Sequence, residues 1–323
     1  MTTVPLKTRR HAQDNIQTIS VVIPTKDRKD DLVHTIESLL TQTRMPDEIM
    51  IVDQSCVPSV DPKTIPIQLV YIHAPHISGL THARNVAMER ARGDIWLFLD
   101  DDVILEREFV EELLVAYSPG VTGVSGIITN YTRPGISRRL FEDLFVRGPF
   151  HDDRQPIYWR AKTLRAGNLK RVKQFTGALM SFRADAVRHL RFDVNLTGGC
   201  LAEDIDFCAR LPRDTVLQIA PNARLLHKRS AIGRPTTHWL DSHSQSSSYM
   251  RHRNWHRGVS DDLSFAWLQI GYALMAAVGS LKRGGSLEPF RAWRAGAQRG
   301  MNLGSRAPTL APASFPKETT VQG

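Results

Sequence analysis

The chain has 323 residues, is 41% hydrophobic and carries a formal net charge of +9. This length suffices for one large globular domain or two small ones, and the charge implies anionic partners: nucleic acid, anionic lipid or nucleotide phosphates. The three cysteines have neither metal-ligand spacing nor a disulfide framework, which suits a reducing compartment. The polar, charged N-terminus shows no secretion-signal pattern.

Short apolar strands alternate with amphipathic helices in the first hundred residues. Residues 1–17 are expected to form a flexible arm. The strands are expected at 19–23, 49–52, 67–72 and 95–99, and the helices at 30–43 and 79–92. This alternation predicts an α/β fold with a mostly parallel sheet and helices on both faces.

The pattern loosens after residue 120. Further strands are expected at 123–128 and 178–182, and a helix near 184–190. Between them, residues 138–173 hold ten lysines and arginines against four acids, which indicates a basic, loop-rich insertion. The polar run 243–248 is read as a flexible loop that closes over a ligand or as a plain linker.

The C-terminal part contains an uncharged stretch from 263 to 281. Three readings stay open for it: a core helix, a helix lying in a membrane interface, or a spanning helix. Residues 282–306 mix arginines with large apolar side chains, which favours contact with an anionic membrane surface. Residues 307–323 have three prolines and few large apolar groups, and they are expected to be disordered.

The strand at 95–99 runs directly into Asp100, Asp101 and Asp102. Adjacent carboxylates repel one another, and a cation would neutralise them. Mg²⁺ and Mn²⁺ take oxygen ligands and are often held by one or two carboxylates plus substrate phosphates. Because open α/β sheets bind ligands at the carboxyl ends of strands, the triplet predicts a metal site. An acidic turn that starts a helix is the alternative.

Several such motifs follow one another in a fixed order. They lie at 21–25, 51–55, 79–85, 93–94, 100–102, 177–178 and 203–206. Over about residues 18–255, the series resembles the family 2 glycosyltransferases with the GT-A fold. The resemblance implies a Rossmann-like sheet with a nucleotide-sugar half (18–120), an acceptor half (121–255), and a C-terminal helical extension (256–306).

The resemblance also implies a donor site in the first half of the chain. Pro24 and Thr25 end the first strand where the family's nucleotide pocket begins, and Asp53 would accept a hydrogen bond from the imide N–H of uracil or thymine. Capping of a turn is the alternative for Asp53. Arg28 would contact a phosphate, unless it is a solvated loop charge.

The remaining donor residues follow the third expected strand. Arg84 and Asn85 would lie near the donor phosphate and sugar, at a helix N-terminus that favours anions. A structural ion pair with Asp94 or Asp100 is the alternative for Arg84. Asp94 would tether Arg84 or the donor sugar.

By the same resemblance, Asp102 contacts the metal directly, and Asp100 faces the ribose or sugar, directly or through the metal. Asp101 is assigned to the donor site, and His227 is a further metal ligand unless it is structural. The acceptor half would supply Asp204 as the general base and Glu203 to position the acceptor. Helix capping is the plainer reading of this acid pair.

These residues together predict an inverting glycosyltransferase that depends on Mg²⁺ or Mn²⁺. It would transfer a sugar from a nucleoside diphosphate, UDP or dTDP rather than GDP, to a hydroxyl of a glycan or lipid-linked acceptor. The expected role is bacterial polysaccharide or cell-surface glycan synthesis in the cytoplasm, with peripheral contact to an anionic membrane. A catalytically inactive scaffold protein of the same fold is the alternative. Nucleic acid is not expected as a partner, because no zinc-finger or RNA-recognition motif accompanies the basic residues.

Overall fold

A computed structural model gives the fold and describes residues 17–65, 69–132, 135–146, 170–196, 202–212, 214–230, 239–253 and 258–306. The expected tail at 307–323, nearly all of the expected arm at 1–17 and much of the basic insertion lie outside these residues. The strands are β1 (Ile19–Thr25), β2 (Glu48–Asp53), β3 (Leu69–His73), β4 (Ile95–Leu99), β5 (Val103–Leu105), β6 (Gly123–Ile128), β7 (Lys170–Val172), β8 (Leu179–Arg183) and β9 (Leu217–His227).

The helices are α1 (Lys29–Leu40), α2 (Leu80–Met88), α3 (Phe109–Val115), α4 (Ile136–Phe141), α6 (Ala184–Val187), α7 (Glu203–Ala209), α8 (Trp239–Arg253), α9 (Val259–Lys282) and α10 (Glu288–Arg306). A 3₁₀ turn, η2 (Pro62–Thr64), precedes β3, and a π-helical turn, η3 (Glu142–Val146), extends α4. The strands and the first helices therefore lie where the hydrophobic pattern predicts them, although α2 and α6 are shorter than expected.

One nine-stranded sheet runs through the molecule in the order β3-β2-β1-β4-β8-β6-β9-β5, with β7 paired to β9. The pairings give β1, β2, β3, β4, β6 and β9 one direction and β5, β7 and β8 the other. The expected mostly parallel α/β sheet is confirmed. Strands β1 to β4 are all parallel, and of the antiparallel strands β7 and β8 lie in the half expected to meet the acceptor, whereas β5 lies in the nucleotide-sugar half.

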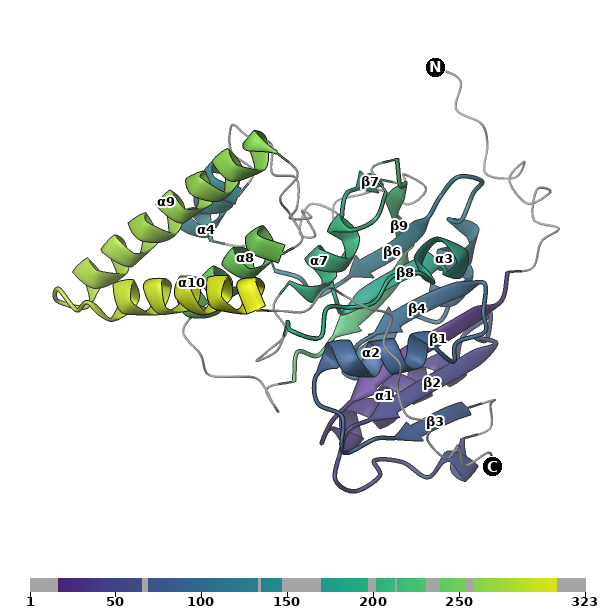
Figure 1. Cartoon of the computed structure of the whole chain (residues 1–323). Coiled ribbons are helices and arrows are strands. Elements are labelled where there is room, and N and C mark those ends of the chain that lie inside the picture. The colour runs from purple at the N-terminus through teal and green to yellow at the C-terminus, as the bar shows by residue number, and fades with distance from the viewer. Residues whose placement is uncertain are drawn as a thin grey trace, which may run out of the picture.

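Helices cover both faces of the sheet (Figure 1). Alternate residues of each central strand point to opposite sides, so Leu97 and Leu99 join the core under α1 and α3 while Trp96 and Phe98 join the core under α2, α6 and α7. Both cores are apolar and fully buried along β1 and β4. Burial on two faces explains why these strands read as continuous apolar runs.

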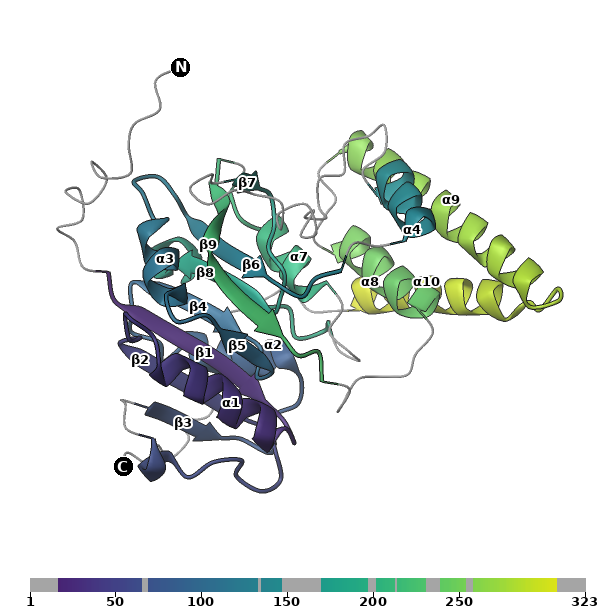
Figure 2. The same ribbon diagram turned by 180° about the vertical axis from the view of Figure 1, so that it is seen from behind.

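The last three helices form an arm beside the sheet (Figures 1 and 2). The expected loop at 243–248 is wrong: these residues are in α8, and Ser244, Ser247 and Ser248 are buried. Two glycines of α10 explain this, because a Cβ at Gly296 or Gly300 would lie 2.2 Å from a backbone carbonyl oxygen of α8. Serines and glycines let the two helices approach closely, so the polar run is a packing surface.

The division expected at residue 256 stays a prediction. Helix α8 lies before this boundary but packs against elements on both sides of it. Leu240 packs with α9 and α10, while Tyr249 and Met250 pack against α7. Within the described residues, one helix, Val259–Lys282, is long and apolar enough to cross a membrane by length and composition, and 28% of its most apolar window is buried.

Candidate active site

The predicted site residues converge on one edge of the sheet. Strands β1, β2, β4 and β9 all end there, at Thr25, Asp53, Leu99 and His227. The antiparallel strand β8 begins there, so Gly177 reaches the same edge from the other direction. Strand direction therefore places residues that are more than a hundred positions apart in the sequence at one site.

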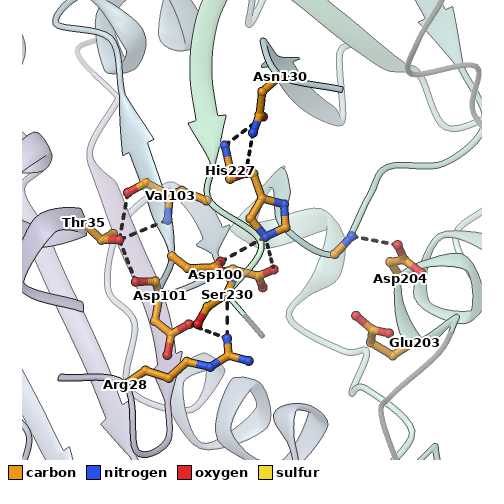
Figure 3. Close-up of polar contacts among 12 residues, drawn as sticks. Arg28, Thr35, Asp100, Asp101, Val103, Asn130, Glu203, Asp204, His227 and Ser230 are labelled. Carbon is orange, nitrogen blue, oxygen red and sulfur yellow. Dashed lines mark hydrogen bonds and ion pairs between the residues drawn. The ribbon is translucent and has the colours of Figure 1, made fainter. Parts of the chain in front are cut away.

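Asp100, Asp102 and His227 form the one group of three potential metal ligands found in the described residues, with ligand atoms within 4.8 Å of one another. His227 Nε2 lies 3.0 Å from Asp102 Oδ1 and 3.7 Å from Asp100 Oδ2 (Figure 3). Asp102 Oδ1 and His227 Nε2 are buried, and apart from their contact with each other no hydrogen bond to them is found in the described part of the chain. Octahedral Mg²⁺ binds at about 2 Å, which puts neighbouring ligand atoms about 2.9 Å apart. The trio fits a divalent ion.

Other groups hold the second carboxylate oxygen of Asp102. It accepts a hydrogen bond from the Ser230 N–H at 2.8 Å and lies 3.9 Å from the Arg28 guanidinium. Burial by itself raises the pKa of Asp102, but His227, the Ser230 N–H and Arg28 together outweigh it and lower the pKa. The carboxylate is therefore charged at neutral pH, as a metal ligand must be.

Asp101 points away from the metal trio. Its carboxylate accepts from the Thr25 hydroxyl at 2.7 Å and from the Arg28 guanidinium at 3.1 Å. Burial raises the pKa of Asp101 to about 6, against the opposing effects of Thr25 and Arg28. Asp101 thus orders the end of β1 and Arg28.

A buried arginine joins the two halves of the site. Arg84 is fully buried and donates to Glu203 Oε1 at 3.0 Å, to the Gly177 carbonyl at 2.7 Å and to Asp100 Oδ1 at 3.4 Å. Its guanidinium also lies 5.3 Å above the Phe192 ring. The ion pair that the sequence suggested with Asp100 is present. Asp100 thus contacts Arg84 through Oδ1 and faces His227 through Oδ2.

The acid pair begins helix α7, directly after Ala202 in the left-handed region (φ 76°). Asp204 accepts from the Gly177 N–H at 2.7 Å and from the Ile205 N–H at 2.8 Å. Burial raises the pKa of Asp204, and burial followed by the charge of Asp204 raises the pKa of Glu203. The resemblance gives Glu203 a role toward the acceptor, whereas the structure directs its carboxylate to Arg84.

Asp53 is closed off from the site. Its carboxylate accepts from the N–H groups of Ser55 at 2.8 Å and Ser59 at 2.7 Å and from the Tyr71 hydroxyl, and it is fully buried. Turn capping, the alternative for Asp53, is what the structure shows. The neighbouring Gln54 is 5% exposed, and its Oε1 lacks a hydrogen-bond partner among the residues described.

Three further residues expected at the donor site have these places in the structure. The Asn85 amide is taken up by the backbone of Phe192, donating to its carbonyl at 2.9 Å and accepting from its N–H at 2.8 Å. Asp94 lies at the opposite end of β4 from Asp100, a separation of about 20 Å at the rise per residue of a strand. Its carboxylate accepts hydrogen bonds from the N–H and hydroxyl of Thr18. Pro24 is buried beside Val52 next to the last residue of β1, as expected, and its role toward the nucleotide stays a prediction. These residues stabilise the frame of the site.

Sequence reasoning missed several supporting residues. Asn130 brackets the backbone of His227, donating to its carbonyl at 2.7 Å and accepting from its N–H at 3.1 Å. The Thr35 hydroxyl oxygen lies 2.8 Å from the carbonyl oxygens of both Asp101 and Val103 and can donate its proton to either one. Asn130 follows a predicted strand, so its position carried a signal. Thr35 lies on a helix face, and nothing local marks it.

Comparison with known proteins gives the family. Residues 20–188, just over half of the chain, match the family described as Glycosyl transferase family 2, so the chain belongs to this family. It is 27% identical over 190 residues to the succinoglycan biosynthesis protein ExoM of Rhizobium meliloti (strain 1021), covering 56% of this chain and 57% of ExoM. It is 31% identical over 131 residues to the uncharacterized glycosyltransferase YwdF of Bacillus subtilis (strain 168), covering 38% and 49%. The chain thus spans about half the length of these relatives.

Solved structures share the fold. The mannosyltransferase PcManGT of Pyrobaculum calidifontis, in complex with GDP-Man and Mn²⁺, aligns with a TM-score of 0.52 and 17% identity over 90% of this chain and 87% of that one. S. aureus TarS 1-349, in complex with UDP-GlcNAc, aligns with a TM-score of 0.56 and 14% identity over 88% and 81%. The expected GT-A fold is confirmed.

Proposed function

We propose that this protein transfers a sugar from a nucleoside diphosphate sugar to an acceptor hydroxyl, with a divalent metal and with inversion at the anomeric carbon. The observation that carries the proposal is the metal trio Asp100–Asp102–His227 joined through Arg84 to the acid pair Glu203–Asp204. Solved neighbours hold Mn²⁺ with a nucleotide sugar, and a relative is named for polysaccharide synthesis, which supports this chemistry.

In this proposal Asp100, Asp102 and His227 would hold Mg²⁺ or Mn²⁺. The ion, when bound, supplies positive charge that stabilises the departing nucleoside diphosphate. The fixed charges of Arg28 and Arg84 flank the same carboxylates, so the site is positive enough to accept a diphosphate once the metal charge is added.

Asp204 would be the base that accepts the acceptor's hydroxyl proton. Burial raises the pKa of Asp204, which makes it a better proton acceptor than an exposed aspartate, and two backbone N–H groups fix its position. The acceptor oxygen would bond to the anomeric carbon as the bond from that carbon to the diphosphate breaks. One displacement inverts the configuration and forms no covalent sugar–enzyme intermediate.

The donor carrier would be UDP or dTDP, and the acceptor a glycan or lipid-linked glycan in the cytoplasm. Since Asp53 is occupied, we assign recognition of the base to Gln54, whose buried Oε1 can accept the imide N–H of uracil or thymine. The solved neighbours hold either GDP-Man or UDP-GlcNAc and therefore do not select a nucleotide. The proposal of UDP or dTDP for this chain is supported by Gln54.

Calorimetric titration of UDP, dTDP and GDP, each with and without Mn²⁺, tests the proposal. The wild type is compared with Asp102→Ala and with Asp185→Ala, which removes an exposed carboxylate of α6 as a matched control. We expect metal-dependent binding of UDP or dTDP that only Asp102→Ala abolishes. Binding of no nucleotide, or binding indifferent to metal and to Asp102, would sink the proposal and favour the inactive scaffold.

A further inference from the structure

Helix α9 exposes a stripe of large apolar side chains. The stripe recurs every three to four residues over most of the helix, so its members share one side. Their exposed fractions run from 47% to 79%, and they are Val259, Leu263, Ile270, Leu274, Val278 and Leu281. Large contiguous apolar surfaces on a folded protein mark contact sites, whereas single exposed leucines do not.

The opposite side of α9 is apolar too, and it is already covered. Tyr272 and Ala276 are buried in a cluster with Leu240 of α8, and Phe290 and Trp293 of α10 pack against that cluster. Tyr272 and Ala276 thus supply the contacts of α9 with α8 and α10, and η3 packs against Trp267 and Gly271, so the residues of the stripe are not part of this packing. A helix that is apolar all round usually has both sides buried.

The α4–η3 segment, which neighbours α9, also exposes apolar side chains. It lies along α9 in both views (Figures 1 and 2), and the Trp267 indole N–H donates to the Leu144 carbonyl at 2.7 Å. Three apolar side chains spaced four residues apart, Ile136, Leu140 and Leu144, are more than half exposed on it. Two neighbouring elements of the arm therefore each expose large apolar side chains.

Basic residues outnumber acidic ones at the C-terminal end of α9 and along α10, whereas Asp261 and Asp262 lie in the first turn of α9. No charged residue lies between 263 and 281, whereas residues 282–306 hold six basic residues and one acid. Lys282 and Arg283 close α9, Arg291 and Arg294 are exposed on α10, and Arg138 is exposed on α4. Arg138 and Arg283 are paired with Glu142 and Glu288, which leaves the remaining basic residues to supply the excess charge. In a dimer formed through this surface the basic residues of the two copies would repel one another, whereas an anionic surface would attract them.

We propose that the outer face of α9, with α4–η3, docks on an anionic lipid bilayer, with the helix lying along the interface. Apolar side chains would enter the acyl boundary, and the basic residues would stay at the level of the headgroups. A spanning α9 would have to leave its contacts with α8 and α10, so the packing on its covered side favours the interfacial position. The surface is separate from the proposed chemistry and does not depend on it.

Vesicle flotation tests the surface on the full chain. Vesicles of phosphatidylcholine alone and of phosphatidylcholine with phosphatidylglycerol are mixed with the wild type, Leu274→Glu and Val115→Glu. Leu274 and Val115 are both 52% exposed, and Val115 lies on α3, away from the arm. The two substitutions therefore place the same charged side chain at equally exposed positions in different parts of the fold. Leu263→Glu, also on the stripe, serves as the second test variant.

We expect the wild type and Val115→Glu to float with anionic vesicles and to bind neutral ones at least tenfold more weakly, with added salt reducing binding. Each stripe variant should lose about tenfold or more in affinity for the anionic vesicles. No flotation of the wild type, or equal binding of both vesicle types, would overturn the proposal. So would a wild-type dimer that Leu274→Glu separates, since the stripe would then be a self-association surface. Nucleotide binding by the same samples reports on the proposed chemistry independently.

Discussion

Replacement of Arg84 by methionine probes the link between the two halves of the site. Methionine keeps much of the length and the apolar stem of arginine but removes the cation that faces Glu203 and Asp100. Glu203 is 5% exposed, so its carboxylate would remain in a poorly solvated site without its partner. Loss of one member of a buried ion pair costs about 3–5 kcal/mol of folding free energy.

The cost should depend on pH. Burial and the charge of Asp204 already raise the pKa of Glu203, and loss of Arg84 removes the opposing influence, so the pKa rises further. An acid with a raised pKa in the folded state binds its proton more tightly there than when unfolded. The folded state therefore loses stability as the pH rises, and because the pKa of Glu203 is about 8 with Arg84 present, Arg84→Met should be more damaging at pH 9 than at pH 6.

Urea unfolding at the two pH values measures this. Arg84→Met should lose about 3–5 kcal/mol at pH 9, and Arg84→Met combined with Glu203→Gln should recover part of that loss because no unpaired charge remains. Arg188→Met, which removes an exposed arginine, should change stability by less than about 0.5 kcal/mol. A loss below about 1 kcal/mol for Arg84→Met at pH 9, or no recovery in the double variant, would refute the reasoning.

Three further changes test other parts of the structure. A Cβ at Gly177 would lie 2.4 Å from Glu203 Oε1, so Gly177→Ala should shift the acid pair and lower kcat at least about tenfold, while Gly135→Ala, in open space, leaves it unchanged. Gly300→Leu should separate α8 from α10 and cost about 1–3 kcal/mol in thermal unfolding, because its Cβ would lie 2.2 Å from the Gln245 carbonyl oxygen; an unchanged Tm would contradict this packing. Since the pKa of Asp204 is raised from 3.8, the activity should fall on acidification at a pH above that value, and Asp204→Asn should abolish transfer while sparing nucleotide binding.

Much of the candidate metal site could be predicted from local sequence. A strand followed by acids predicts a ligand-binding edge, and Asp100, Asp102 and His227 do come together there. The order of the motifs gave the family, which the match over 20–188 confirms. Strand ends are readable because an apolar run stops where the chain turns, and in a parallel sheet those ends share one edge.

The errors have a common cause. Asp53, Asn85 and Asp94 each follow or flank a strand or helix in the expected place, yet each is taken up by a backbone partner. A carboxylate or amide at an element's end suits capping as well as ligand binding, and the sequence does not say which partner is nearer. The polar run 243–248 misled for a related reason, because serines pack well where a glycine-rich helix approaches.

The sequence by itself determined the α/β architecture, the family and the residues able to hold a metal, because these follow from hydrophobic periodicity and from chemistry carried by single segments. The tertiary structure decided which of those residues meet. It turned Glu203 toward Arg84, bonded Asp53 to Tyr71, and left Gln54 Oε1 without a hydrogen-bond partner among the described residues. It also covered one side of α9 and left the other exposed, since packing between distant segments alone settles which apolar surface is internal.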